Sequence, residues 1–193
     1  MTVASTITDA PPAAIGPGRL VLVVGPSGAG KDTLMALAQA ACAEQRGVVF
    51  PRRVVTREAS PSEDNAHLSP EQFGLALERG DFAMHWQAHG HSYGLPRAID
   101  DDVRAGRTVV ANVSRTVVEA MRHAYAQVTV VSITAPPEVL AKRLAARARG
   151  SDGQLAERLR RSVDDAAAPD VTINNVGSAE HHARELVRII RGE

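Results

Sequence analysis

The stretch from Gly25 to Lys31, with the sequence GPSGAGK, constrains this chain more than any other part of it. It follows an apolar run at residues 20–24, which is typical of a buried parallel strand, and it precedes a helical pattern at residues 34–40. A strand, a glycine-rich turn with the spacing G-x4-G-K and a helix together form the context of a phosphate-binding loop. The alternative is an ordinary tight turn between a strand and a helix.

A loop of this kind binds the phosphate chain of a nucleotide. Its glycines let the backbone curl so that several N–H groups point into one concave space, and the helix N-terminus adds about half a positive charge there. The Lys31 side chain places a full charge near the outer phosphates. We therefore predict that the nucleotide contacts Gly25, Pro26, Ser27, Gly28, Ala29, Gly30, Lys31, Asp32 and Thr33.

Asp32 departs from the general pattern of these loops, in which Ser or Thr follows the lysine and its hydroxyl binds Mg²⁺. Thr33 cannot simply replace it, because successive helix positions are about 100° apart. A carboxylate is itself a good Mg²⁺ ligand, so we predict a metal-related role for Asp32, directly or through a bound water. Alternatively, Asp32 only complements the helix dipole in the first turn.

Length and composition limit the classes of function. A chain of 193 residues is expected to form one α/β domain, which we place at residues 19–193. Residues 1–18 are rich in Ala, Thr and Pro and lack the features of a signal peptide, so we expect them to form a flexible tail. The 22 basic and 22 acidic side chains balance, and six aromatic residues are too few for a base-stacking surface, so nucleic acid is not expected as a partner.

Similar observations predict the cellular compartment of the protein. No apolar run approaches the roughly 20 residues of a membrane span, so no membrane is expected as a partner. The single cysteine, Cys42, cannot form an internal disulfide and lies in a helical stretch, where we expect a small core residue. The chain is therefore predicted to be cytoplasmic. The sequence leaves its oligomeric state open between a monomer and a homodimer.

Strand and helix patterns alternate along the chain, which predicts a parallel sheet with helices on both faces. One strand is expected across residues 48–50 and 53–55, interrupted by Pro51, and others at residues 108–113, 128–133 and 171–173. Helices are expected at residues 98–105, 116–124, 138–147, 154–167 and 179–191. Ligands bind beyond the carboxyl ends of such strands, where the chain places Gly25, Thr56, Arg57, Asn112, Ser114, Arg115, Thr134 and Asn174.

Residues 56–97 are predicted to be a substrate-binding insertion. A helix start is marked by Ser69 as N-cap, Pro70 at the first position and Gln72 three residues after the cap, and this helix should end at Gly80. Residues 81–97 mix apolar side chains, His and Gly, a composition that suggests short strands and turns forming a wall of the substrate site.

Arginines concentrate between residues 143 and 161, around a loop bounded by Gly150 and Gly153. Because the planar guanidinium binds phosphate at two points, such a cluster suits the transfer of a phosphoryl group. We predict a lid at about residues 147–157 and choose Arg143, Arg147 and Arg158 as catalytic residues together with Lys31. The alternative is a solvated basic face.

With the loop, Thr56-Arg57, Tyr93-Gly94 and the Arg-rich segment in this order, the chain resembles guanylate kinase across about residues 20–190. It is still more similar to the ribose 1,5-bisphosphate phosphokinase family, on motifs that include GPSGAGKDT at 25–33, GDFA at 80–83, WQAHG at 86–90 and YGLP at 93–96. Asp32 belongs to the loop pattern of that family. Val113, in place of Gly, and Ala148, which interrupts the Arg-Gly-Arg of the lid, depart from it.

The differences from guanylate kinase concern the acceptor. Met84 stands where an acidic residue of that family reads the guanine edge, and Leu95 stands where a small hydroxyl residue follows Tyr-Gly. A guanine edge buried without partners would cost about 1–3 kcal/mol for each group. An acceptor that carries more phosphate and has no nucleobase fits these residues better.

The resemblance implies that ATP phosphorylates ribose 1,5-bisphosphate, giving 5-phosphoribosyl 1-diphosphate in phosphonate breakdown, with ATP and Mg²⁺ as cofactors and a phosphorylated sugar as the small-molecule partner. The expected acceptor contacts are Arg57, His67, His89, Tyr93, Asn112, Ser114 and Arg115. Two alternatives remain: a nucleoside monophosphate kinase of the guanylate type, and a non-catalytic binding module of the same fold.

Overall fold

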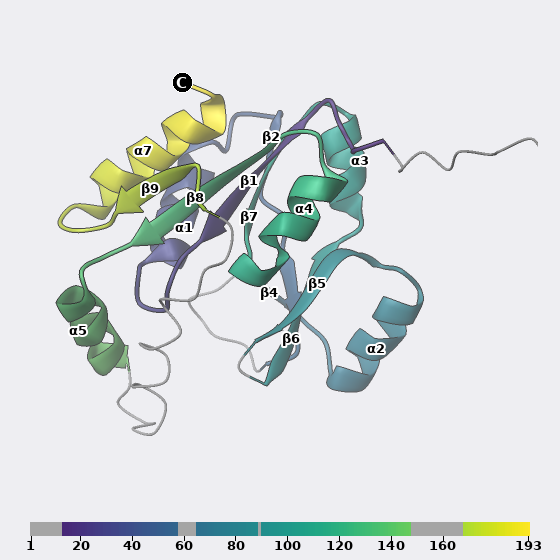
Figure 1. Ribbon diagram of the computed structural model, residues 1–193, viewed down its shortest axis with the longest axis horizontal. Helices are drawn as coiled ribbons and strands as arrows, with labels where there is room; N and C mark the ends of the chain where they lie inside the picture. Colours follow the sequence, from purple (N-terminus) through teal and green to yellow (C-terminus); the bar gives the residue numbers. More distant parts are fainter. Residues whose placement is uncertain (1–12, 58–64, 89, 148–167) are drawn as a thin grey trace, which may run out of the picture.

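The computed structural model describes residues 13–57, 65–88, 90–147 and 168–193. Its centre is a five-stranded parallel sheet in the order β2-β7-β1-β8-β9 (Figure 1). The strands are β1 (Arg19–Val24), β2 (Val48–Val49), β7 (Thr108–Asn112), β8 (Val128–Thr134) and β9 (Val171–Asn174). This confirms the predicted α/β class with a parallel sheet, and it places β1, which leads into the phosphate-binding loop, in the middle.

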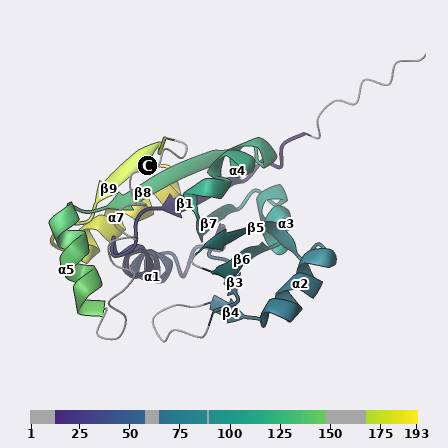
Figure 2. The ribbon, with the colours of Figure 1, turned by 60° about the horizontal axis from the view of Figure 1, so that its bottom comes forward.

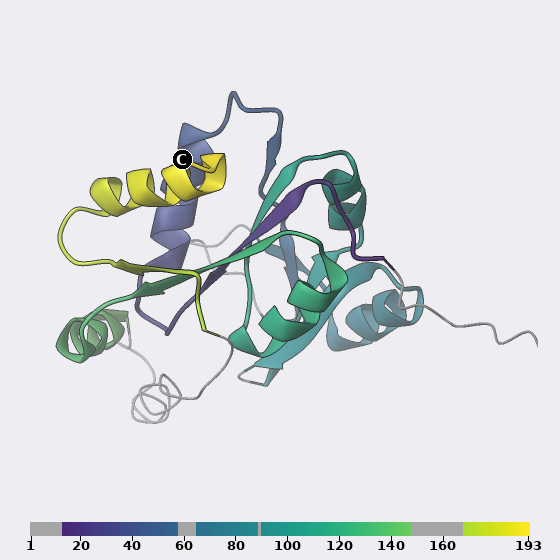
Figure 3. The same ribbon diagram turned by 45° about the horizontal axis from the view of Figure 1, so that its top comes forward.

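Helices cover both faces of this sheet because alternate residues of β1 point to opposite sides. On one face, Val21 and Val23 pack with α1 (Lys31–Ala41) and α7 (Ala179–Arg191), which lie side by side in Figures 1 and 3. On the other face, Leu20, Leu22 and Val24 pack with α3 (Ala98–Arg104), the 3₁₀ turn η1 (Arg115–Val117) and α4 (Val118–Ala124). The remaining helix of this domain among the described residues is α5 (Pro137–Arg147).

The predicted insertion at residues 56–97 and the strand just before it form a second, mixed sheet in the order β4-β3-β6-β5. Its strands are β3 (Arg53–Val55), β4 (Asn65–His67), β5 (Phe82–Ala88) and β6 (His91–Pro96). The predicted single strand across residues 48–55 is therefore wrong. Pro51 ends the pairing with the first sheet, so Val48–Val49 pair with β7 and Arg53–Val55 pair with β4 and β6.

The helix of the insertion, α2 (Pro70–Glu78), begins as the sequence predicts. The Ser69 hydroxyl accepts a hydrogen bond from the Gln72 N–H at 3.1 Å, and the Gln72 side chain accepts one from the Ser69 N–H at 2.9 Å. Phe73 of this helix stacks on Phe82 of β5, with ring centroids 4.6 Å apart. Figure 2 shows this small sheet and α5 on opposite sides of α1.

Three further expectations can be compared with the described residues. Residues 13–18 of the predicted tail contact the domain: the Ile15 N–H donates to the Ala124 carbonyl, and Ile15 forms a parallel bridge with Tyr125, so at least this part is not a free extension. Cys42 is buried, as predicted, and burial raises the pKa of its thiol. None of the helices among the described residues is both long and apolar enough to cross a bilayer.

Candidate active site

The loop between β1 and α1 requires glycine at two positions. Gly25 has a φ of +142°, and a Cβ there would collide with the Ile133 carbonyl of β8. Gly30 precedes the first residue of α1 with a φ of +88°, and a Cβ there would collide with the side-chain amide of Asn175. The turn can therefore lie against its neighbours only because these residues lack side chains.

Lys31 is the first residue of α1 and reaches back over the loop. Its Nζ donates hydrogen bonds to the carbonyls of Gly25 at 2.8 Å and Pro26 at 3.0 Å. The ammonium group is thus held at the concave side of the turn, next to the positive end of the helix. This is the position from which a lysine can contact the outer phosphates of a nucleotide.

Asn175 and Arg143 support the loop from the side. The buried Asn175 donates its side-chain N–H to the Ala29 carbonyl at 2.7 Å, and its backbone N–H donates to Thr134 at the end of β8. The Arg143 guanidinium donates to the Asn175 carbonyl at 3.0 Å and to the Ala29 carbonyl at 3.4 Å. Arg143, predicted as a catalytic lid residue, therefore contacts the backbone of the phosphate-binding loop.

The other predicted lid arginines cannot be placed in the same way. Arg147 is the last residue of α5, and its side chain is not among the described ones. Arg158, most of the predicted lid and the predicted helix at residues 154–167 lie outside the described residues, as does His89.

A polar network joins the loop helix to both sheets. The Asn112 side chain, at the end of β7, donates to the Asp32 carboxylate at 3.3 Å. Arg53 of β3 donates to the Asn112 carbonyl at 3.3 Å and to the Asn65 side-chain oxygen at 3.3 Å. Asp32 lies in the first turn of α1, so it also faces the positive end of that helix.

Sequence reasoning missed Arg53. Its guanidinium carbon lies 5.4 Å from the centre of the Tyr93 ring, a cation–π contact. Burial lowers the pKa of Arg53, and the carboxylate of Asp32 opposes that shift. The sequence did contain one signal. Residues two apart in a strand share a face, so Arg53 faces the same side as the core residue Val55.

The remaining predicted contacts lie around this network. Tyr93 is buried and stacks on Trp86 with centroids 5.6 Å apart, while His67 is exposed and its Nδ1 lies 2.8 Å from the Arg57 carbonyl. Ser114 is the N-cap of η1, where its hydroxyl accepts from the Thr116 N–H. The other two predicted acceptor contacts, Arg57 and Arg115, are half-buried. Among the predicted nucleotide contacts, Pro26 and Ser27 are partly exposed, Gly28 is buried and Thr33 is exposed.

The fold, the loop and the family match together define the class of the protein: a kinase of the guanylate kinase fold with a loop of the phosphate-binding type. The family model described as guanylate kinase matches residues 17–193. A guanylate kinase from Anaplasma phagocytophilum has the same fold, with a TM-score of 0.67 and 23% identity over 93% of this chain and 86% of that one.

Curated relatives indicate a more specific family within this class. The ribose 1,5-bisphosphate phosphokinase of Bradyrhizobium diazoefficiens is 66% identical over 100% of this chain and 98% of its own length. The protein of that name from Rhodopseudomonas palustris is 65% identical over 92% of this chain and 90% of its own. The chain belongs to the ribose 1,5-bisphosphate phosphokinase family, within the guanylate kinase class.

Proposed function

We propose that this chain transfers the γ-phosphoryl group of ATP to the 1-phosphate of ribose 1,5-bisphosphate. The products are ADP and 5-phosphoribosyl 1-diphosphate, and the reaction serves phosphonate breakdown. The observation that most strongly supports this proposal is the 66% identity, over the whole chain, to a curated enzyme named for this reaction. The phosphate-binding loop and Lys31 supply the nucleotide site that such a reaction needs.

The residues predicted to contact the acceptor support a substrate that has no nucleobase. Met84 and Leu95 face each other across the β5–β6 pair, Leu95 is 1% exposed, and Met84 packs against the core cluster of that face. Neither side chain can hydrogen-bond the edge of a guanine. Arg53, Arg57 and Arg115 instead bring positive charge to this end of the molecule, as an acceptor with two phosphates requires.

The proposed mechanism needs positioning and charge neutralisation rather than a general base. The 1-phosphate is already anionic near neutral pH, so its oxygen attacks the γ-phosphorus while the bond to the β-phosphate oxygen breaks and ADP leaves with those electrons. The loop amides and Lys31 hold the nucleotide phosphates. Asp32, oriented by Asn112, would hold Mg²⁺, which neutralises charge on the phosphates when bound.

A panel of phosphoryl acceptors tests the proposed substrate. Each acceptor is incubated with ATP and Mg²⁺, and the products are followed by phosphorus NMR. We expect ribose 1,5-bisphosphate to be converted far faster than GMP, with a new diphosphate signal at the sugar. Equal or faster turnover of GMP would favour the guanylate-type kinase, and failure to bind ATP in calorimetry would favour a non-catalytic module.

Lys31→Ala tests the nucleotide site. We expect kcat/KM to fall at least about 100-fold, because the charge that meets the outer phosphates is lost. The chain has one other lysine, Lys142, which is exposed on α5, so Lys142→Ala is a matched control and should retain activity. Circular dichroism checks that both variants fold. An active Lys31→Ala enzyme would contradict the assigned role.

A further inference from the structure

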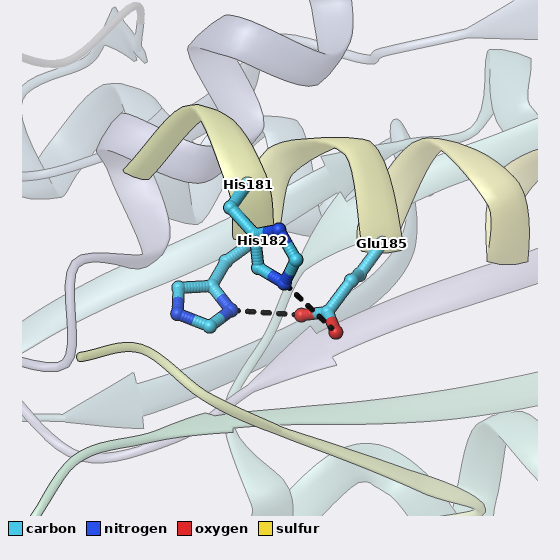
Figure 4. Close-up of side chains that lie close together, drawn as sticks. All are labelled: His181, His182 and Glu185. Carbon is cyan, nitrogen blue, oxygen red and sulfur yellow. Dashed lines mark hydrogen bonds and ion pairs between the residues drawn. The ribbon is translucent and has the colours of Figure 1, made fainter. Parts of the chain in front are cut away.

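A group of metal-ligating side chains lies on α7, away from the residues used above. Figure 4 shows His181, His182 and Glu185 on the first two turns of this helix. Each offers one ligand atom, and these atoms all lie within 4.8 Å of one another. The pairs that include Glu185 are closer: His182 Nδ1 is 2.8 Å from one carboxylate oxygen, and His181 Nε2 is 3.7 Å from the other.

These separations suit a small divalent ion. Zinc lies about 2.0–2.2 Å from histidine nitrogens and carboxylate oxygens, so two ligands of a tetrahedral ion are about 3.4 Å apart. The two separations that involve Glu185 lie on either side of that value, and the ligating nitrogens of the two rings lie within 4.8 Å of each other. Side-chain exposures of 56% for His181, 13% for His182 and 38% for Glu185 leave room for water at the remaining coordination position.

The second nitrogen of His182 gives an independent indication. His182 Nε2 lies 2.9 Å from the backbone carbonyl of Val176, so it carries a proton and donates it there. Histidines that bind metal usually donate their other ring N–H to a carbonyl or carboxylate, which fixes the tautomer and the ring orientation. This bond directs the other ring nitrogen, Nδ1, toward Glu185.

That arrangement needs a positive species between the two side chains. A ring nitrogen with its lone pair facing a carboxylate oxygen at 2.8 Å would be repelled, unless a proton or a cation lies between them. A proton satisfies His182 and Glu185 alone. A metal ion would also engage His181, whose ring lies edge-on to that of His182 with centroids 5.1 Å apart.

We propose that His181, His182 and Glu185 form a binding site for one divalent transition-metal ion, of which Zn²⁺ is the probe of choice. The site is separate from the phosphate-binding loop and does not rest on the proposed kinase reaction. It is connected to that loop through the chain, because Val176 follows Asn175, which holds the Ala29 carbonyl. The hydrogen bond from His182 to the Val176 carbonyl links α7 to the segment that supports the loop, and a bound ion would fix the ring that donates it.

Zinc titration of the full-length, tag-free, metal-free chain at pH 7.5 tests the site. We measure binding by competition with a chromophoric chelator and expect one Zn²⁺ per chain at micromolar concentration. His182→Ala and Glu185→Gln should each weaken binding at least about tenfold. His123→Ala should bind as the wild type does, because His123 is an exposed helical histidine outside the cluster.

Thermal unfolding provides a second readout. An ion that binds only the folded chain should raise the melting temperature of the wild type by about 5 to 10 °C at one hundred times the Kd, and Glu185→Gln should lose this shift. Glu185→Gln keeps the side-chain size, so it separates lost binding from lost folding. The proposal is overturned if the wild type shows no saturable site, or if the wild type, His182→Ala and Glu185→Gln bind zinc equally.

Discussion

Arg53 combines three features: it shares a strand face with the core residue Val55, it makes a cation–π contact with Tyr93, and it donates a hydrogen bond to the Asn112 carbonyl. Its neighbour Asp32 was identified from the loop motif alone, because that motif is local and fixed in spacing. Arg53 could not be identified in this way. Its contacts with Asn65 and Asn112 come from residues 12 and 59 positions away, which only the pairing of the two sheets brings together.

Replacing Arg53 by Met tests whether this charge serves the acceptor. We expect the kcat/KM for ribose 1,5-bisphosphate to fall about tenfold to a hundredfold, because hydrogen bonds to charged groups contribute about 1.5–3 kcal/mol. The KM for ATP should change less. Arg52→Met is the matched control, since Arg52 precedes it and is exposed. A similar loss in both variants, measured in initial-rate kinetics, would contradict a specific role for Arg53.

Among the elements, the α1, α3, α4 and α7 helices and the strands β1, β7, β8 and β9 were predictable to within a few residues, because apolar periodicity is a local signal. The small sheet was not. Residues 48–50 and 53–55 each contain two adjacent valines typical of a strand, and nothing local shows that they pair with different partners. Strand pairing depends on contacts far apart in the chain, which a short sequence window does not contain.

The capping box of α2 gives a prediction at this scale. Ser69→Ala removes the acceptor for the Gln72 N–H and should lower the free energy of unfolding by about 1 kcal/mol. Urea unfolding monitored by circular dichroism measures this difference. Glu71→Ala, an exposed substitution in the same first turn, should cost less. Equal effects would show that helix charge rather than the cap hydroxyl is responsible.

The segment between β9 and α7 gives a second prediction. Asn175→Asp keeps the side-chain size but removes the N–H that the Ala29 carbonyl accepts. We expect the KM for ATP to rise about two- to tenfold, as the loss of one hydrogen bond implies. Thr172→Ala, on the exposed side of the edge strand β9, should leave it unchanged. An unaltered KM in Asn175→Asp would show that the loop holds its shape without this support.

For the whole molecule, one buried polar contact joins two of the helices that cover the same face. The Tyr125 hydroxyl, just after α4, donates to the Asp100 carboxylate of α3 at 2.6 Å, and both residues are buried. Burial and this hydrogen bond raise the pKa of Tyr125, so the phenol stays protonated. The contact is therefore a neutral donor satisfying a buried carboxylate.

Tyr125→Phe should lower the free energy of unfolding by about 1–3 kcal/mol, because it leaves a buried oxygen of Asp100 without this donor. The double variant Tyr125→Phe/Asp100→Asn provides the control. Since the two residues share one bond, the loss in the double variant should be smaller than the sum of the single losses. Strict additivity in denaturant unfolding would contradict this coupling.

The central position of β1 also affects how the protein fluctuates. Its residues from Leu20 to Val23 are fully buried, and hydrogen-bonded strands lie on both sides. Amide protons in such a strand exchange with deuterated water only when the domain opens globally, whereas the edge strands β2 and β9 can open locally. The turn that begins at Gly25 should therefore follow a slowly exchanging strand, and its curvature should persist while the edge strands open locally.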